Sequence, residues 1–325
     1  MKLVEVVAES GYRDTIQGIA EQQLAADWWD VGSGEQGRAV VRLLLAPEQL
    51  QAALDSLQGA LGGGEFRIVV MDIEAVLPRP EEPAVEPENP VTASREELYE
   101  RIEAGTRLDS NYLLLVVLST VVAAIGLIED NVGVVIGAMV IAPLLGPNLA
   151  LALGTALGDQ ALIWRAVKAN LAGLAIAFAL SLAIGFLWPL ELASHELLSR
   201  TDVGLDSLAL ALASGAAAVI SLTGSLASVL VGVMVAVALL PPTATFGMML
   251  GAGQLQMATG AGLLLLANVV CVNLAAKLVL LAKHVRPRTW LEKRKAQQSM
   301  RSYLLLWAVS LGLLILVILL REARP

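Results

Sequence analysis

The sequence is poor in the residues that build disulfides and metal sites. It has one cysteine, Cys271, and two histidines, His195 and His284, which lie far apart along the chain. A single cysteine forms no intrachain disulfide, so cysteine usage leaves the redox compartment open. The histidines show no metal-ligand spacing. The sequence therefore predicts no metal site and no cofactor.

Motifs of catalysis and secretion are also missing. The chain contains no P-loop, HExxH, GxSxG or CxxC motif, and we expect it not to be an enzyme. Its first residues lack the long apolar segment and small-residue cleavage site of a signal peptide.

Charged residues are few and unevenly distributed. They make up 16% of the chain, against about 25% in a typical soluble domain. Residues 1–110 hold 21 of the 30 acidic and 9 of the 22 basic residues, a balance of −12, whereas residues 111–325 carry a balance of +4. Nucleic-acid phosphates attract lysine and arginine, so an acidic head argues against a nucleic-acid partner.

Hydrophobic residues, 56% of the chain, gather in long runs. A membrane helix needs about 20 apolar residues to cross about 30 Å of hydrocarbon. Seven runs approach this length, and the fourth is the weakest because it is rich in alanine and glycine. They span residues 111–128, 132–154, 169–188, 207–223, 227–250, 259–282 and 302–320. The sequence therefore predicts a polytopic α-helical domain in a lipid bilayer.

Residues 1–77 follow a different pattern. Short β-branched runs alternate with two helical segments, one at 15–26 and one opened by Pro47. The predicted order is βαββαβ, the split βαβ pattern of ferredoxin-like α+β domains. Such a domain can serve as a structural cap, an oligomerisation module or a small-molecule sensor, and the fold alone does not decide.

Two loops of this head are candidate sites for an anionic ligand such as a nucleotide. One contains Ser10 and Gly11, and the other contains Gly32, Ser33 and Gly34. Each can bring backbone N–H groups close to an anion. Neither matches a specific phosphate-binding motif.

Residues 78–107 form the predicted linker. Its first part is rich in proline and glutamate, which favours extended chain. Ser94 precedes Glu97 at capping-box spacing and opens a charged helix that leads into the transmembrane domain, 108–283. Residues 284–325 comprise a basic segment and a last membrane helix.

The distribution of lysine and arginine predicts the orientation. Residues 283–301 hold seven basic residues and one acid, Glu292, so we expect this segment to be cytoplasmic. Counting spans from it puts Arg165, Lys168 and the head on the cytoplasmic side of a prokaryotic inner membrane, and the C-terminus outside.

An internal repeat is the most informative feature of the membrane domain. Residues 136–148, IGAMVIAPLLGPN, align with residues 231–243, VGVMVAVALLPPT, at an offset of 95. The same offset relates 108–188 to 203–283. Each unit contains three predicted spans. Because an odd number of crossings leaves the chain on the other side of the membrane, the second copy begins from the opposite side and has the opposite orientation. The pattern predicts an inverted repeat, as in many secondary transporters.

The second span of each repeat contains prolines near its middle. Pro143 and Pro147 interrupt the first copy, and Pro241 and Pro242 interrupt the second. Proline removes an amide donor and frees a carbonyl, which is costly in hydrocarbon unless it lines a cavity or packs in protein. Paired interruptions indicate a substrate path, although both helices could instead be kinked only for packing.

Polar residues near the breaks complete the predicted path, because polar groups within spans are costly and often functional. Lys277, near a helix end, is expected to extend its amine to the interface instead. The path residues are Pro143, Gly146, Pro147, Asn148, Pro241, Pro242, Thr243, Thr245, Asn268 and Asn273.

The proline-containing segments 108–147 and 221–242 resemble a prokaryotic membrane-protein family, the uncharacterised hydrophobic domain called domain of unknown function 389. The resemblance extends over nearly the whole chain. It implies a prokaryotic inner-membrane protein with a cytoplasmic head, and it supplies no catalytic or binding residues.

Two hypotheses remain at this point. The first is a transporter or channel for a small solute or ion, regulated by a ligand of the head. The alternative is a membrane-anchored sensor whose head binds a nucleotide or a similar anionic metabolite. Both are compatible with a homo-oligomer, because the head exposes sheet edges and the membrane helices carry small-residue faces.

Overall fold

A computed structural model describes residues 1–34, 37–78, 95–188, 194–223, 228–283 and 290–322. Most of the predicted linker and the residues between 283 and 290 lie outside this part of the chain. The chain divides into two compact units, Met1–Glu97 and Leu98–Pro325, each described here by itself.

The first unit, the head, has the element order predicted from the sequence. It consists of β1 (Lys2–Glu9), a short 3-10 turn η1 (Ser10–Tyr12), α1 (Arg13–Gln22), β2 (Asp27–Gly34), β3 (Arg38–Leu45), α2 (Pro47–Leu61) and β4 (Arg67–Asp72). The strands form one antiparallel sheet in the order β2-β3-β1-β4. Chain neighbours β1 and β2 are therefore separated by β3, as a split βαβ arrangement requires.

The head packs its two helices against alternate residues of the sheet. Val4, Val6 and Ala8 of β1 are buried while the residues between them are only partly so, because successive strand side chains point to opposite faces. Leu50 and Leu54 of α2 join the same hydrophobic core.

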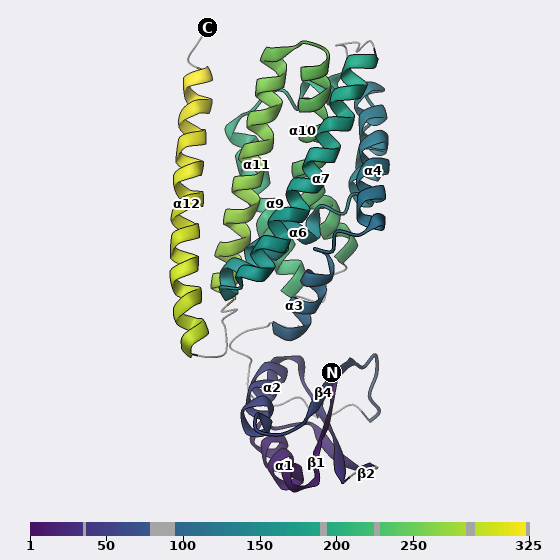
Figure 1. The fold of residues 1–325 in the computed structure, drawn as a ribbon, viewed down its shortest axis with the longest axis vertical. Helices are drawn as coiled ribbons and strands as arrows, with labels where there is room; N and C mark the ends of the chain where they lie inside the picture. The colour runs from purple at the N-terminus through teal and green to yellow at the C-terminus, as the bar shows by residue number, and fades with distance from the viewer. Residues whose placement is uncertain (35–36, 79–94, 189–193, 224–227, 284–289, 323–325) are drawn as a thin grey trace. The chain divides into compact units, whose positions relative to one another are not determined.

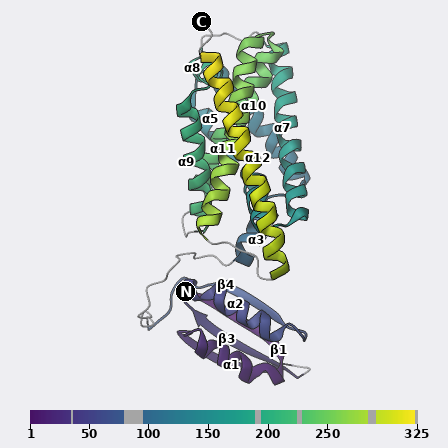
Figure 2. The same cartoon turned by 90° about the vertical axis from the view of Figure 1, so that its left-hand side faces the viewer.

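The second unit, which we call the membrane unit, consists of helices (Figure 1). Its larger helices run along a common long axis in both views (Figures 1 and 2). In chain order they are α3 (Arg95–Ala104, which begins in the head unit), α4 (Ser110–Ile128), α5 (Val132–Ile141), α6 (Leu145–Leu157), α7 (Gln160–Leu187), α8 (His195–Leu198), α9 (Leu205–Thr223), α10 (Ser228–Gly251), α11 (Leu255–Ala282) and α12 (Trp290–Glu322).

Four described helices are long and apolar enough to cross a membrane: α4, α7, α11 and the part of α12 from Tyr303 to Arg321. The bent pair α5–α6 gives a fifth if it counts as one span. An apolar stretch of α9, Leu205–Ser221, is shorter, and the first side chains of α10 lie outside the described residues. Seven spans and the inverted repeat thus stay predictions, whereas a membrane-spanning protein is supported.

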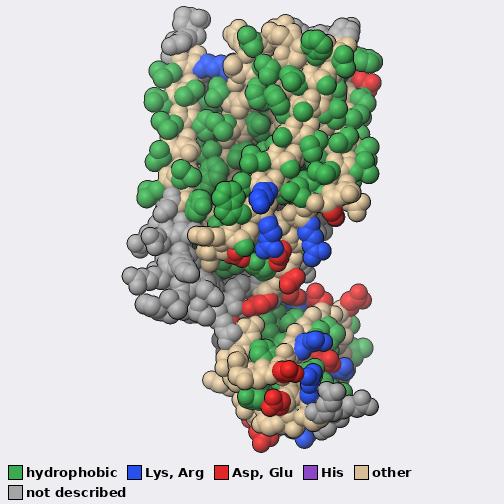
Figure 3. Space-filling view, viewed as in Figure 1, with side chains coloured by type: hydrophobic (Ala, Val, Ile, Leu, Met, Phe, Trp, Pro, Cys, Tyr) green, Lys and Arg blue, Asp and Glu red, His purple; other side chains and the backbone are tan. Residues whose placement is uncertain are grey.

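The surface of the membrane unit fits this conclusion. On the face drawn in Figure 3, hydrophobic side chains cover the body of the unit and charged side chains lie toward its ends. Large apolar residues such as Leu114, Leu171 and Leu305 are well exposed. In water such a surface would be unfavourable, and in a bilayer it faces acyl chains.

Helices α7 and α10 approach each other through glycines. A Cβ atom added to Gly247 of α10 would lie 2.7 Å from the carbonyl oxygen of Phe178, and one added to Gly185 of α7 would overlap the carbonyl oxygen of Met248. Helices without a water-driven hydrophobic force associate by this kind of close backbone packing. The glycines therefore fix the α7–α10 contact.

Candidate functional site

The first predicted helix break is present. Helix α5 ends at Ile141, α6 begins at Leu145, and the two are bent by 54°. Ala142 between them has φ −65° and ψ 122°, an extended conformation. Its successor is Pro143, and a residue that precedes proline is driven out of the helical region by the proline ring. The proline thus accounts for the break.

Gly146, one of the predicted path residues, makes the tightest contact at this break. A Cβ atom on Gly146 would lie 2.7 Å from the carbonyl oxygen of Gly105, and one on Gly105 would lie 2.9 Å from the Cα atom of Gly146. The segment after α3 therefore rests directly on the first turn of α6. Any side chain at either position would push the two backbones apart.

Three asparagines from three helices meet just beyond the break, and we call them the asparagine cluster: Asn148, Asn170 and Asn273. The Nδ2 of Asn148 in α6 donates to Asn170 Oδ1 in α7 at 3.0 Å. The Nδ2 of Asn273 in α11 donates to Asn148 Oδ1 at 3.3 Å. Asn273 is 0% exposed and its Oδ1 has no hydrogen-bond partner among the described residues. The cluster therefore holds one buried, unused acceptor.

The second predicted break is wrong. Pro241 and Pro242 lie inside α10, which continues from Ser228 to Gly251. A proline in a helix leaves the carbonyl four residues earlier without its usual amide donor. For Pro242 this is the carbonyl of Ala238, and it accepts from Asn268 Nδ2 at 2.8 Å. Membrane helices tolerate proline where a neighbouring helix satisfies the freed group in this way.

The residues after the two proline motifs behave alike. Asn148 Nδ2 donates to the carbonyl oxygen of Leu144 at 2.9 Å, and Thr243 Oγ1 donates to that of Leu239 at 2.6 Å. Each bond runs to the carbonyl four residues earlier. Thr245 is also buried, and its hydroxyl has no partner among the described residues.

Helix α11 connects the two proline motifs. Its Asn273 contacts α6 beyond the first motif, and its Asn268 contacts α10 at the second. The two asparagines are five residues apart, or about 7.5 Å along a helix axis. The structure therefore brings Asn148 and Asn273 together directly, and α11 links both to the Pro242 motif.

Lys277 is a buried cation that the sequence interpretation placed wrongly. Its side chain does not reach the surface: the residue is 0% exposed. Its Nζ lies 5.0 Å from the ring centroid of Tyr303 and 5.1 Å from that of Trp307, both in α12. Helix α12 covers the lysine, and the sequence alone does not show which face of α11 the next helix covers.

Comparisons with known proteins identify the family of the chain. A family model described as Domain of unknown function (DUF389) matches residues 139–274. Uncharacterized protein MJ0678 of Methanocaldococcus jannaschii is 34% identical over 281 residues, which cover 86% of this chain and 87% of that protein. The chain belongs to the DUF389 family. No solved structure matches it.

The region matched by the DUF389 model begins in α5 and ends in α11. It contains the helix break, all of α10 and the whole asparagine cluster. Neither the family description nor the name of the relative states a function. The function of this DUF389 protein must therefore be argued from its geometry.

Polar contacts fix α3 against the start of α7. Tyr99 Oη donates to Asp159 Oδ2 at 2.7 Å, and Arg165 forms an ion pair with Glu103. Burial, and then the hydrogen bond to Asp159, raise the pKa of Tyr99 to about 12. Burial opposes ionisation of Asp159, yet the bonds from Tyr99 and from two backbone amides hold its pKa below the usual range.

A hollow of about 200 Å³ lies beside these contacts, between α3 and α7. It contains three cations and one carboxylate, Glu103, which is already paired with Arg165. Its lining residues are Glu103, Thr106, Arg107, Leu108, Arg165 and Lys168. The hollow places positive charge at this end of the membrane unit.

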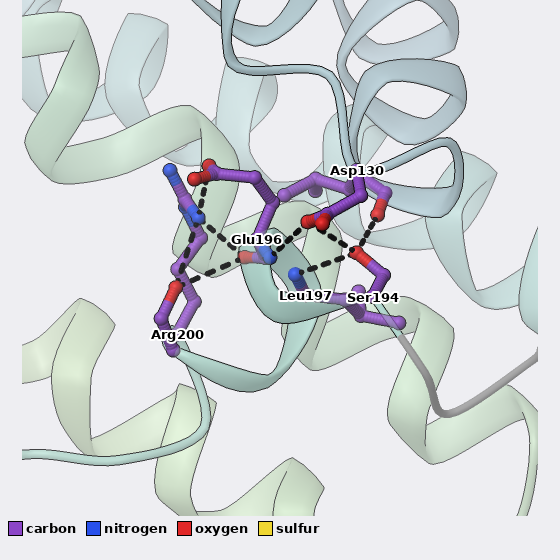
Figure 4. Close-up of polar contacts among 7 residues, drawn as sticks. Asp130, Ser194, Glu196, Leu197 and Arg200 are labelled. Atoms are coloured by element: carbon purple, nitrogen blue, oxygen red, sulfur yellow. Dashed lines mark hydrogen bonds and ion pairs between the residues drawn. The ribbon is translucent and has the colours of Figure 1, made fainter.

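The loop at the opposite end of α4 is held by a second polar cluster (Figure 4). Asp130 Oδ1 accepts from the backbone N–H of Glu196 at 2.7 Å and from Ser194 Oγ at 3.3 Å. Ser194 also caps α8, and Arg200 pairs with Glu196 at 2.7 Å. Each group is used within the loop, so this cluster has a structural role.

In the head, one candidate loop is not a loop. Gly32, Ser33 and Gly34 belong to β2 and pair with β3, after a bulge between Asp30 and Gly32. The amide of Gly32 is bonded to Asp30 Oδ1, and that of Ser10 to the carbonyl oxygen of Gly37. Gly11 lies exposed in η1. The amides of Ser10 and Gly32 are thus already used within the head, and an anion site at these residues stays a prediction.

Proposed function

We propose that this protein carries a small solute or ion across the inner membrane of a prokaryote, along a path that passes the asparagine cluster. The observation that supports this is a broken span whose break adjoins hydrogen-bonded asparagine side chains from three helices, two of them buried. In membrane proteins, irregular backbone and uncharged polar groups at depth are costly, and they are retained where a solute or ion is handled.

The proposal places the head in the cytoplasm, as the distribution of lysine and arginine favours. There it would regulate transport by binding a small ligand. The alternative function is a sensor in which the head binds the ligand and the membrane unit serves only as an anchor. The two differ in one measurable property, because an anchor moves no solute.

The test is flux into proteoliposomes that contain the full chain, measured across a panel of inorganic ions, amino acids and organic acids. We expect uptake of at least one class above protein-free liposomes. Asn273→Ala and Asn148→Ala should reduce that uptake by at least tenfold, because each removes a side-chain bond of the cluster.

Asn131→Ser is the matched control. Asn131 caps α5 outside the cluster, and serine retains a capping oxygen, so uptake should stay unchanged. Size-exclusion chromatography shows whether each variant is folded. If no member of the panel is taken up, the sensor function is favoured. If both cluster variants show wild-type uptake, the transport path does not pass the asparagine cluster.

A further inference from the structure

Lys277 has no acidic partner among the residues that the structure describes. Helices α6 and α11 contain no aspartate or glutamate, and neither does α12 from Tyr303 to Arg321. Among the described residues no ion pair includes Lys277, and its Nζ has no hydrogen-bond partner. Within the described part of the chain, this fully buried amino group thus contacts two aromatic rings and no hydrogen-bond partner.

Those two rings do not replace a counter-ion. A cation over an aromatic face gains less free energy than an ammonium ion loses on leaving water, even after the protein relaxes. The difference is the reason that buried charges in proteins are paired or bind ligands. A negatively charged ligand would offset the remaining cost of burying the ammonium group.

A second unused donor lies at the same place. The indole Nε1 of Trp307 is buried and has no hydrogen-bond partner among the described residues, although the Trp307 ring is one of the two beside Lys277. Buried indole N–H groups normally find an acceptor. Two neighbouring unpaired donors, one of them charged, match a ligand that accepts hydrogen bonds and carries negative charge.

The position connects to the asparagine cluster. Asn273 lies four residues before Lys277, so the two share one face of α11. Helix α6, which carries Asn148, packs against both α11 and α12. Lys277 therefore lies one helical turn along α11 from Asn273, a residue of the proposed path.

We propose that Lys277 and Trp307 form a binding site for a small monovalent anion, with the ammonium group supplying the charge and the indole N–H a directed hydrogen bond. The site has one positive group and two donors, which suits a halide, nitrate or a small carboxylate. Binding of such an anion does not depend on the proposed function. The further statement that this anion is the transported species rests on it.

Trp307 makes the site observable, because iodide quenches indole fluorescence on contact. The full chain is placed in phosphatidylcholine nanodiscs, which offer no anionic lipid headgroup, and titrated with iodide at constant ionic strength. We expect a saturable phase of quenching above the linear quenching of exposed tryptophans. Chloride and nitrate should compete with that phase.

Four proteins make the test specific. Lys277→Met should lose the saturable phase or weaken it at least tenfold, Lys277→Arg should retain it, and Trp307→Phe should remove the signal. Replacing a buried charge by an apolar side chain is often neutral or stabilising, so Lys277→Met should melt at or above the wild-type temperature without iodide.

Quenching that is only linear in the wild type, or a saturable phase unchanged in Lys277→Met, would overturn the anion site. Flux separates this result from the proposed function. Saturable binding without uptake of iodide leaves the site intact and argues against transport of this anion. Uptake that Lys277→Met does not change, with linear quenching, leaves transport intact and removes the site.

Discussion

At the scale of the single residue, Asn268 lets a helix continue through a proline pair. Its amide donates to the carbonyl of Ala238, the group that Pro242 deprives of a backbone partner. The bond runs between α11 and α10, so it both satisfies a buried acceptor and joins two helices.

This relation predicts a coupling between two substitutions. Asn268→Leu should lower the free energy of unfolding by about 1–3 kcal/mol, because the Ala238 carbonyl becomes a buried acceptor without a donor. In a Pro242→Ala background the penalty should shrink by about half or more, because residue 242 then supplies its own N–H. Thermal melting of the four proteins of this cycle, in one detergent, measures the effect.

Equal losses of stability in both backgrounds would contradict the coupling and assign Asn268 a packing role.

The sequence already marked Asn268, Asn273 and Asn148 as polar residues in spans. It could not indicate their partners, because the Asn273–Asn148 bond joins residues that are 125 positions apart. Nor could it show Lys277 beneath Tyr303 and Trp307. Such contacts depend on which helix faces pack against one another.

At the scale of the element, two proline motifs with matching sequences produce different structures. Pro143 ends α5 because the residue before it turns extended, whereas α10 passes through Pro241 and Pro242. The sequence could predict where helices lose a backbone hydrogen bond, since each proline removes one amide donor at a known position. It could not predict which helix breaks, because the neighbour that satisfies the freed carbonyl comes from another part of the chain.

Glycines in the same helices allow a matched prediction. Gly247→Ala should lower the melting temperature by several degrees, because its Cβ atom would lie 2.7 Å from both Phe178 and Ser181. Gly137→Ala in α5 meets nothing within 4 Å, so it should be neutral or stabilise by about 0.5–1 kcal/mol. Melting curves of both variants beside the wild type test this pair. If Gly137→Ala lowered the melting temperature as much as Gly247→Ala, the difference in packing around the two glycines would not determine their tolerance of alanine.

At the scale of the whole molecule, the question is which end faces the cytoplasm. Helix α4 is a candidate span from Ser110 to Ile128, with the basic hollow near its start and the Asp130 loop after its end. Lysine and arginine favour the cytoplasmic side of a membrane, so the sequence predicts that the basic hollow and the head face the cytoplasm. On this prediction the Asp130 loop faces outward.

Cysteine labelling tests this orientation in intact cells. The native Cys271 is buried and should react little with a membrane-impermeant maleimide. Ser199→Cys, exposed in the loop beside Asp130, should be labelled, whereas the exposed Ser10→Cys of the head should react only after the cells are permeabilised. The reverse pattern would invert the molecule and place the head outside. A regulatory ligand would then come from outside the cell, and cytosolic nucleotides would be excluded as ligands of the head.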